Sequence, residues 1–207
     1  MKVQILVDNI NSWIVPFVKE FVSKKTNIKL IHHHEEVKTG DVLFLVSCEK
    51  KFTKLNLNQN NLVIHESDLP KGKGWSPLTW QVLEGKTTIP ITLFEANLAF
   101  DSGKVFEKIN LTLDGSELID ELRQKQAEAT FKLISNFIQN YPNNVGIPQV
   151  GNSTFYPKRT AKDSSLDPSK SIEEQFNLLR VVDNDRYPAF FEHKGNKYII
   201  KIEKDAK

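Results

Sequence analysis

The sequence predicts an α/β fold in which helices flank a mostly parallel β-sheet. Short apolar runs that are typical of buried strands alternate with amphipathic stretches of helical period over the first 140 residues. The first strand, helix and strand together take about thirty residues, and a βαβ unit of this size places its two strands parallel in one sheet. No Gly-x-Gly-x-x-Gly sequence follows the first strand, so this unit does not indicate a dinucleotide site.

The first unit begins with a strand over residues 3–7, and Ser12 is expected to cap a helix that begins at Trp13. Pro16 lies in the first turn of that helix, where proline costs no backbone hydrogen bond. Apolar and charged side chains then recur at helical spacing, which predicts one buried face and one exposed face. A second strand is expected over residues 28–31.

Three histidines and a single cysteine border the next strands. Residues 32–34 are all histidine, but consecutive side chains of an extended chain point to alternate faces, so we predict no metal site. A third strand over residues 42–47 ends at Cys48, which as the single cysteine excludes an internal disulfide. Its place directly after an apolar strand favours buried packing over a nucleophilic role.

The composition is that of an ordinary globular protein. Of the 207 residues, 39% are hydrophobic and 26% are charged, and the length suits one large domain or one domain with a small appendage. The net charge of +2 is too near neutral to indicate a nucleic-acid binder. No apolar run approaches the ~20 residues of a membrane span, and the N-terminus begins a strand rather than a signal peptide. We therefore expect a cytoplasmic protein.

Residues 62–103 carry the strongest functional signal of the chain. An apolar run ends directly at His65, and a loop with two lysines and two glycines leads to a short helix over residues 77–83. The next strand, over residues 89–94, is followed by a loop that contains Asp101. In an open α/β sheet, ligands bind beyond the carboxyl ends of the strands. There an imidazole and a carboxylate can act as a base with its orienting partner, although either residue taken alone is better explained as a strand cap or an ordinary turn.

The order of residues in this stretch resembles the core of the folate-dependent formyltransferases, a family that includes methionyl-tRNA formyltransferase and the sugar N-formyltransferases. The family hallmark is Asn-x-His-x-Ser-x-Leu-Pro, followed about three dozen residues later by an Asp-x-Gly loop. The C-terminal tail, residues 180–202, resembles the tail of nucleotide-sugar formyltransferases. The positions that match the core are His65, Ser67, Leu69, Pro70, Lys73, Gly74, Pro77, Gly85, Asp101 and Gly103.

The chain departs from the family pattern at two places. The family has an asparagine two residues before the histidine, where its amide helps to hold the formyl oxygen, and this chain has Val63. The resemblance implies that another donor, a backbone N–H or Asn97, takes over or that activity is lost, and the otherwise intact stretch favours a new donor. Only 64 residues precede His65, against about a hundred in full-length members. The resemblance therefore implies a shortened N-terminal half and a folate pocket that is more open or completed differently.

The C-terminal part of the chain combines a long helix with an irregular tail. Residues 105–113 are expected to form a short strand pair, and Ser116 is expected to cap an amphipathic helix over residues 116–138. Residues 145–165 lack periodicity, and within them the aromatic and basic residues 155–160 are equally consistent with a nucleotide contact and with a surface strap. A short helix and a hairpin are expected over residues 172–179, 189–192 and 197–202.

The resemblance implies an N-formyltransferase with a catalytic domain over residues 1–140 and a C-terminal strap, short helix and hairpin over residues 141–207. It would move a formyl group from 10-formyltetrahydrofolate to the 4-amine of a nucleotide-linked amino-dideoxy sugar, such as a UDP-linked 4-amino-4,6-dideoxy-N-acetyl-altrosamine. His65 would accept the amine proton, and Asp101 would orient His65. No metal is needed. The residues expected to bind the donor are Ser47, Cys48, Glu95, Ala96, Asn97, Leu98 and Phe100, and those expected to bind the acceptor are Lys71, Lys73, Trp75, Arg159, Arg180 and Arg186.

Three alternatives stay open at this point. The acceptor could be methionyl-tRNA, although the size and charge of the chain disfavour it. Water could be the acceptor in a formyltetrahydrofolate hydrolase that uses the same histidine and aspartate. Val63 and the short N-terminal half are also consistent with an inactive protein that binds folate or a nucleotide sugar without turnover. We expect no nucleic-acid or membrane partner, and the sequence leaves open whether the protein is a monomer or a homodimer.

Overall fold

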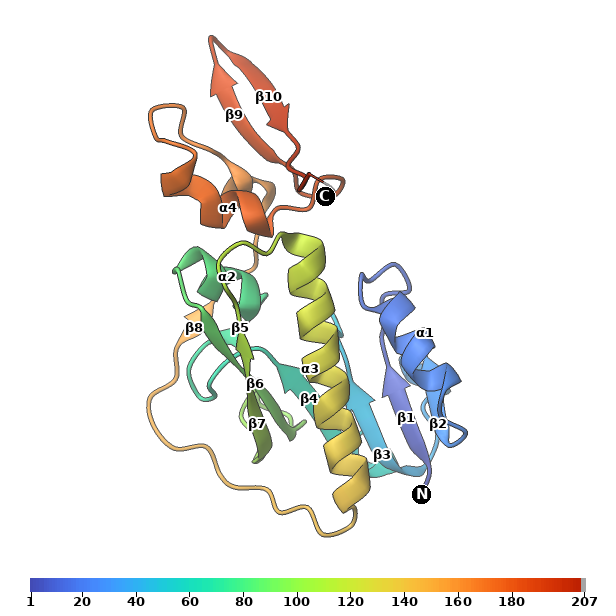
Figure 1. The fold of residues 1–207 in the computed structure, drawn as a ribbon. Coiled ribbons are helices and arrows are strands. Elements are labelled where there is room, and N and C mark those ends of the chain that lie inside the picture. Colours follow the sequence, from blue (N-terminus) through green and yellow to red (C-terminus); the bar gives the residue numbers. More distant parts are fainter. Residues whose placement is uncertain (206–207) are drawn as a thin grey trace.

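A six-stranded sheet forms the centre of the molecule in the computed structural model, which describes residues 1–205 (Figure 1). Its strand order is β2-β1-β3-β4-β6-β7. The pairs that join β2, β1, β3 and β4 are parallel, and the pairs β4–β6 and β6–β7 are antiparallel, so the predicted mostly parallel sheet is confirmed. The strands are β1 (Val3–Leu6), β2 (Ile28–Ile31), β3 (Gly40–Leu45), β4 (Asn58–His65), β6 (Thr88–Glu95) and β7 (Val105–Thr112).

The two faces of the sheet are covered differently. Helices α1 (Val15–Ser23), α2 (Pro77–Leu83) and α3 (Ile119–Asn140) contribute to the main core on one face. The opposite face carries a smaller apolar cluster around Phe52, next to the 3₁₀ turns His34–Glu36 and Leu55–Leu57. Successive strand residues alternate between these faces because side chains of a strand point to opposite sides. The strands therefore present side chains to two different environments at their carboxyl ends.

Helix α1 begins two residues later than predicted. Ile14 precedes its first turn, and Pro16 lies within that turn as expected. Ser12 does not cap the helix, and its hydroxyl lies instead 3.2 Å from the hydroxyl of Ser47 in the loop after β3. The predicted cap is therefore wrong, because this serine links two loops at the carboxyl edge of the sheet.

Helix α3 begins at Ile119 rather than at the predicted Ser116. The backbone N–H of Ser116 donates to Asp114 Oδ1 at 2.7 Å, which holds this residue in a turn before the helix. The N–H of Leu118 donates to the carboxylate of Glu121 at 2.8 Å. A glutamate in the first turn thus satisfies an N–H group at the helix start, and the predicted cap at Ser116 is wrong.

Residues 105–112 form one strand, β7, and not the predicted pair of short strands. β7 pairs with β6 from Val105 opposite Phe94 to Thr112 opposite Thr88, with a bulge between Leu93 and Phe94. The backbone groups of the segment find their hydrogen-bond partners in this pairing, so a turn within it would leave them unpaired.

After α3 the chain returns across the molecule as an irregular segment, residues 141–160, which we call the strap (Figure 1). Within the strap, β8 (Phe155–Tyr156) pairs in parallel with β5 (Lys73–Gly74), which belongs to the loop after β4. The predicted short helix and hairpin follow, and the division into domains at residue 140 stays a prediction. No helix within residues 1–205 is long and apolar enough to cross a membrane. The remaining elements are the 3₁₀ turns Ala161–Ser164 and Glu173–Gln175, α4 (Phe176–Val181), β9 (Ala189–His193) and β10 (Asn196–Ile200).

Candidate active site

A cavity of 430 Å³ opens at the carboxyl ends of β3 and β4. His65 is the last residue of β4, and the loops after β3 and β6 form two walls of the cavity, which we call the His65 cavity. This position agrees with the rule that open α/β sheets bind ligands beyond their strand ends. The polar side chains in its wall include Ser47, His65, Glu66, Asn97, Asp101 and Gln126.

The His65 ring is held through one of its two nitrogens. Nε2 lies 2.8 Å from the carbonyl oxygen of Gly72 and 3.9 Å from Oδ2 of Asp101. A carbonyl oxygen can only accept a hydrogen bond, so Nε2 carries a proton and the neutral ring keeps its lone pair at Nδ1. Nδ1 is therefore the atom that can take up a proton, and Asp101 lies close enough to stabilise the positive charge that results.

Asp101 is positioned by the loops around it. Its φ of 47° is left-handed, a conformation that aspartate adopts more readily than most residues. Oδ2 accepts the backbone N–H of Gly74 at 3.0 Å. The side-chain amide of Gln149 donates to the carbonyl oxygens of Asp101 and Gly103, at 3.0 and 2.9 Å. The strap, which contains Gln149, therefore fixes the Asp101 loop from outside the sheet.

We expect Gly103→Ala to displace the Asp101 loop. A Cβ at Gly103 would lie 1.8 Å from the carbonyl oxygen of Glu95, so the backbone must move. Overpacking of this kind costs about 1–3 kcal/mol, which corresponds to a Tm lower by roughly 2–10 °C in a protein of this size. Calorimetry should show this shift together with a loss of the activity proposed below. Gly195→Asn is the control, because an added Cβ there meets nothing within 4 Å and asparagine adopts a left-handed φ such as the 79° of Gly195 more readily than most residues. Equal Tm values for both variants would contradict the prediction.

The residues predicted to bind the donor lie mostly in one wall of the cavity. Burial raises the pKa of the Cys48 thiol to about 12, so this thiol is not a nucleophile near neutral pH. Lys51 donates to the carbonyl oxygen of Leu98, and its Nζ lies 5.2 Å from the centre of the Phe100 ring. The loops after β3 and β6 thus close against each other. Of the seven predicted residues, Ser47, Cys48, Ala96, Asn97 and Phe100 line the cavity, and Glu95 and Leu98 do not.

This wall suits the pterin ring of a folate. Phe52, Val63 and Phe94 provide an apolar lining, and Asn97 adds one side-chain amide. Sites for flat heteroaromatic ligands combine such an apolar slot with a few directed polar groups. The residues present therefore fit a folate donor, and they would hold its ring between the loops after β3 and β6.

The residues predicted to bind the acceptor are dispersed. Trp75 lines the His65 cavity, and Nζ of Lys158 lies 4.7 Å from the centre of a Trp75 ring. Lys71 is exposed, whereas Lys73 is buried with its Nζ 6.0 Å from the centre of the Phe155 ring. Neither lysine lines the cavity. Trp75 is thus the one residue of this predicted set that the structure brings to His65.

The three predicted arginines lie elsewhere. Arg159 donates to the carbonyl oxygen of Asp163 at 3.3 Å and links the strap to the turn that follows it. Arg180 is only 2% exposed and pairs with Glu117 at 2.6 Å, which leaves its guanidinium unavailable to a ligand. Arg186 lines a different cavity. Arg180 is therefore a structural residue and not part of an acceptor site.

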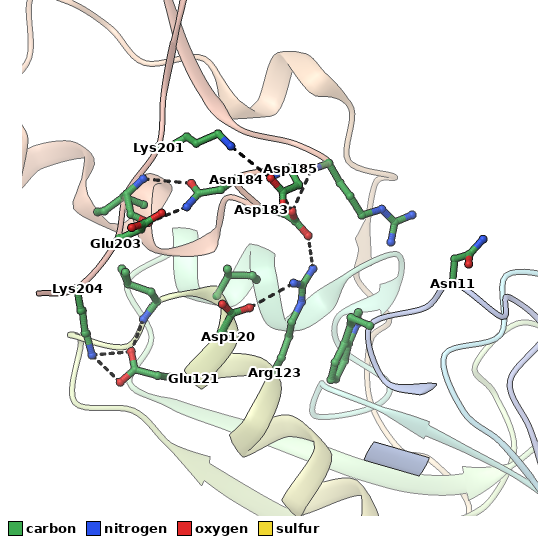
Figure 2. Close-up of a pocket in the computed structure, with 15 residues that line it drawn as sticks. Asn11, Asp120, Glu121, Arg123, Asp183, Asn184, Asp185, Lys201, Glu203 and Lys204 are labelled. Carbon is green, nitrogen blue, oxygen red and sulfur yellow. Dashed lines mark hydrogen bonds and ion pairs between the residues drawn. The ribbon is translucent and has the colours of Figure 1, made fainter. Parts of the chain in front are cut away.

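A second cavity, of 780 Å³, lies between the start of α3 and the residues around the C-terminal hairpin (Figure 2). Most of its charged side chains pair with one another, as Arg123 does with Asp183 and Lys204 does with Glu121, both at 2.6 Å. Trp13 lines both cavities, so they adjoin. Because most charges of the larger cavity are engaged in such pairs, and because the smaller cavity contains His65 and Asp101, the smaller cavity is the better candidate for catalysis.

Several residues around the site belong to no sequence motif and were not predicted from the sequence. Gln126 donates to Glu66 Oε1 at 2.7 Å in the cavity wall. The Thr154 hydroxyl accepts the N–H of Gly72 at 2.8 Å, and Gln149 holds the Asp101 loop as described. Gln126, Gln149 and Thr154 are more than sixty residues away from His65 in the sequence, so no local pattern identifies them. Glu66 follows His65 at a variable position of the motif.

Comparison with known proteins finds sequences similar to this chain. No family model matches the chain. A methionyl-tRNA formyltransferase of Thermosipho melanesiensis is 32% identical over 120 residues, which are 58% of this chain and 39% of that protein. The bifunctional polymyxin resistance protein ArnA of Wigglesworthia glossinidia brevipalpis is 26% identical over 199 residues, which are 93% of this chain and 28% of that protein. The chain thus spans less than half the length of these relatives.

The solved structures that share the fold of this chain include two formyltransferases and HypX. A methionyl-tRNA formyltransferase from Clostridium thermocellum matches with a TM-score of 0.82 at 20% identity, over 100% of this chain and 96% of that one. A 4-N formyltransferase from Francisella tularensis matches with a TM-score of 0.72 at 16% identity, over 100% and 98%. HypX from Aquifex aeolicus in complex with tetrahydrofolic acid matches with a TM-score of 0.75 at 16% identity, over 98% and 37%. The chain is therefore similar in sequence to part of the methionyl-tRNA formyltransferases, and it shares the fold of the solved formyltransferase structures.

Proposed function

We propose that the protein transfers a formyl group from 10-formyltetrahydrofolate to the primary amine of a nucleotide-linked amino sugar. The observation that carries the proposal is the pair His65 and Asp101, with Nε2 and Oδ2 3.9 Å apart, in a cavity whose wall fits a folate. The donor supplies an activated formyl group. The protein must then supply a base for the amine, a partner for that base, and a hydrogen-bond donor for the oxygen on which charge develops.

In this proposal His65 is the base. Its Nδ1 accepts the proton that the amine loses during attack, while Nε2–H stays bonded to the carbonyl oxygen of Gly72. Asp101 stabilises the positive charge of the ring, and the N–H of Gly74 keeps Asp101 in place. Only 7% of His65 is exposed, which limits the access of water as a competing acceptor.

Asn97 is the proposed donor to the formyl oxygen, since Val63 stands where the family has its asparagine. The Oδ1 of Asn97 accepts the N–H of Ala99 and the hydroxyl of Ser102, both at 3.0 Å. A backbone N–H can only donate, so this contact identifies the amide oxygen and leaves the NH₂ group for another partner. Because Asn97 lines the His65 cavity, that partner can be a ligand.

Asn97→Ala should lower kcat by about 10²–10³-fold, because the loss of one oxyanion donor has an effect of this size. The KM for the donor should change little. Adding Val63→Asn to this variant should restore part of the rate, since it returns the amide of the family pattern. Steady-state kinetics of the single and double variants measure both effects, with Asn152→Ala in the exposed strap as control. Unchanged kcat in Asn97→Ala would assign the role to a backbone N–H instead.

The proposed acceptor rests on the chemistry at the cavity rim and on the relatives. Trp75 and Lys158 offer an aromatic face and a positive charge, which suit a nucleotide base and a phosphate. A sugar N-formyltransferase from Shewanella sp. FDAARGOS_354 is among the solved structures of this fold, which supports a sugar amine. Methionyl-tRNA is the second candidate, favoured by the Thermosipho melanesiensis relative and disfavoured by the net charge of +2. The cytoplasmic location stays a prediction.

One assay tests these possibilities together. The protein is incubated with 10-formyltetrahydrofolate and, in separate reactions, with UDP- and dTDP-linked 4-amino-4,6-dideoxy sugars, methionyl-tRNA, or buffer alone. Mass spectrometry of the acceptor and a formate assay identify the product. A formylated sugar supports the proposal. A formylated tRNA would instead identify methionyl-tRNA as the acceptor, and free formate would identify a hydrolase. Folate binding without any product would identify an inactive binding protein.

A further inference from the structure

The His65 cavity extends over the end of β4 to both faces of the sheet. Val63 contacts the smaller cluster on one face, and Ile64 lies in the main core beneath α3 on the other. By strand alternation, His65 shares the side of Val63, and Glu66 shares the side of Ile64. The contact of Glu66 with Gln126 of α3 agrees with this. An acceptor group above the strand end can therefore meet His65 from one side and Glu66 from the other.

Glu66 is held firmly in this position. Its Oε1 accepts the side-chain amide of Gln126 at 2.7 Å, and its backbone carbonyl oxygen accepts the amide of Gln81 at 2.5 Å. Glu66 takes part in none of the ion pairs formed within residues 1–205, and hydrogen bonds to its Oε2 are likewise absent from that part of the chain. A carboxylate in a cavity wall that lacks a protein cation is suited to a cationic ligand.

We propose that Glu66 binds the ammonium group of the acceptor and thereby selects an amine over a hydroxyl at the reacting position. The inference rests on the proposed function, because it names what recognises the amine of that acceptor. Aliphatic amines are protonated near neutral pH, and a carboxylate forms a charge-assisted hydrogen bond to an ammonium that a neutral hydroxyl cannot match. Glu66 touches the substrate in this arrangement, and Gln126 is its positioning residue.

In this proposal Glu66 and His65 each accept one of the two protons that the ammonium group loses. One proton passes from the ammonium nitrogen to the Glu66 carboxylate, which frees the lone pair that attacks the formyl carbon. As the new C–N bond forms, the second proton passes to His65. The bond between the formyl carbon and the donor nitrogen breaks, and that nitrogen takes the proton from His65. The Glu66 proton then leaves to solvent. Burial raises the pKa of the Glu66 carboxyl, which suits it to hold this proton briefly.

Calorimetric titration with a matched pair of nucleotide sugars tests the role of Glu66. The probes are UDP- and dTDP-linked 4-amino-4,6-dideoxy sugars and their 4-hydroxy counterparts. The wild type should prefer the amine, and Glu66→Gln should weaken amine binding by about 10- to 100-fold, as expected for a lost hydrogen bond to a charged group. Binding of the hydroxy sugars should not change. Glu66→Asp should keep part of the preference, and Glu128→Gln on the exposed face of α3 should keep all of it.

The possible failures are distinguishable. If Glu66→Gln keeps the preference for the amine, or weakens the binding of the amino and hydroxy sugars equally, Glu66 does not recognise the ammonium group. The proposed function stands in that case. If Glu66→Gln does not fold, Glu66→Asp decides in its place, and an amine preference raised or unchanged in that variant overturns the inference. If the wild type binds neither sugar of any pair, the proposed acceptor is wrong and this inference fails with it.

Discussion

Replacing His65 by alanine should lower kcat for formyl transfer by about 10²–10⁴-fold, the usual contribution of a positioned general base. Its ring is the one imidazole in the wall of the cavity at the strand ends, and its Nδ1 keeps the lone pair because Nε2–H is bonded to the carbonyl oxygen of Gly72. The amine can still bind in the variant, so the KM values should change much less than kcat. A rate effect confined to kcat is the mark of an interaction made in the transition state.

The measurement is a steady-state assay with the best acceptor of the panel, beside a folate-binding titration of the same variant. Intact folate binding shows that the cavity has kept its shape. His33→Ala is the matched control, because this histidine is exposed and lies outside the cavity. A His65→Ala enzyme that keeps kcat within about threefold of the wild type would remove the histidine from the mechanism.

Glu117→Gln should lower the free energy of unfolding by about 3–5 kcal/mol, the usual cost of leaving one partner of a buried ion pair without the other. The carboxylate of Glu117 lies 2.6 Å from Arg180, and both residues are 2% exposed. Arg180 also donates through Nε to the backbone carbonyl oxygen of Glu117 at 2.9 Å. The pair joins α4 to the start of α3, so its loss weakens the attachment of the C-terminal part.

The effect of Glu117→Gln should depend on pH. Burial alone would raise the pKa of the Glu117 carboxyl, but hydrogen bonds from Lys125 and from the N–H groups of Asp114 and Gly115 outweigh it and hold that pKa below its ordinary value. A carboxyl with a lower pKa in the folded state stabilises the fold above its unfolded pKa, and this contribution is lost as the pH falls. The difference between wild type and variant should thus be full at neutral pH and shrink below about pH 4.

Urea unfolding at several pH values measures this difference. Glu20→Gln is the control, because the pair of Glu20 with Lys24 is exposed and should contribute little at any pH. A pH-independent difference between wild type and Glu117→Gln would show that packing, and not charge, explains the loss of stability.

Those parts of the fold that local patterns determine could be predicted from the sequence. The apolar runs that became β1, β3, β4 and β6 are buried strands because their side chains supply both faces of one sheet. Helix starts were less predictable, since Ser12 and Ser116 are good caps by residue type but hydrogen-bond elsewhere. The choice between such partners depends on tertiary contacts, such as that of Ser12 with Ser47, which a local pattern does not contain.

In the candidate site too, residues of a local motif could be predicted from the sequence, and residues placed by tertiary contacts could not. His65 and Asp101 belong to one motif around two neighbouring strands, so their proximity could be expected. The structural role of Arg180 could not be predicted from the sequence, because its partner Glu117 is 63 positions away. The local sequence around an arginine does not show whether it binds a phosphate or a buried carboxylate. Gln149 could not be found either, because its role comes entirely from where the strap crosses the Asp101 loop.

The strap is synthesised after the strands whose loops it holds in place. A nascent chain has all strands of the central sheet once Thr112 has emerged, and the helix that covers it ends at Asn140. His65 and Asp101 already exist at that stage, yet Gln149 and Thr154, which fix the loops beside them, have not been made. During synthesis a domain generally folds as a unit, once all the segments that it needs have been released. We therefore expect a chain stalled at residue 140 to contain all six strands of the sheet, but to lack Val181 of the main core and the contacts that Gln149 and Thr154 make with the loops beside His65.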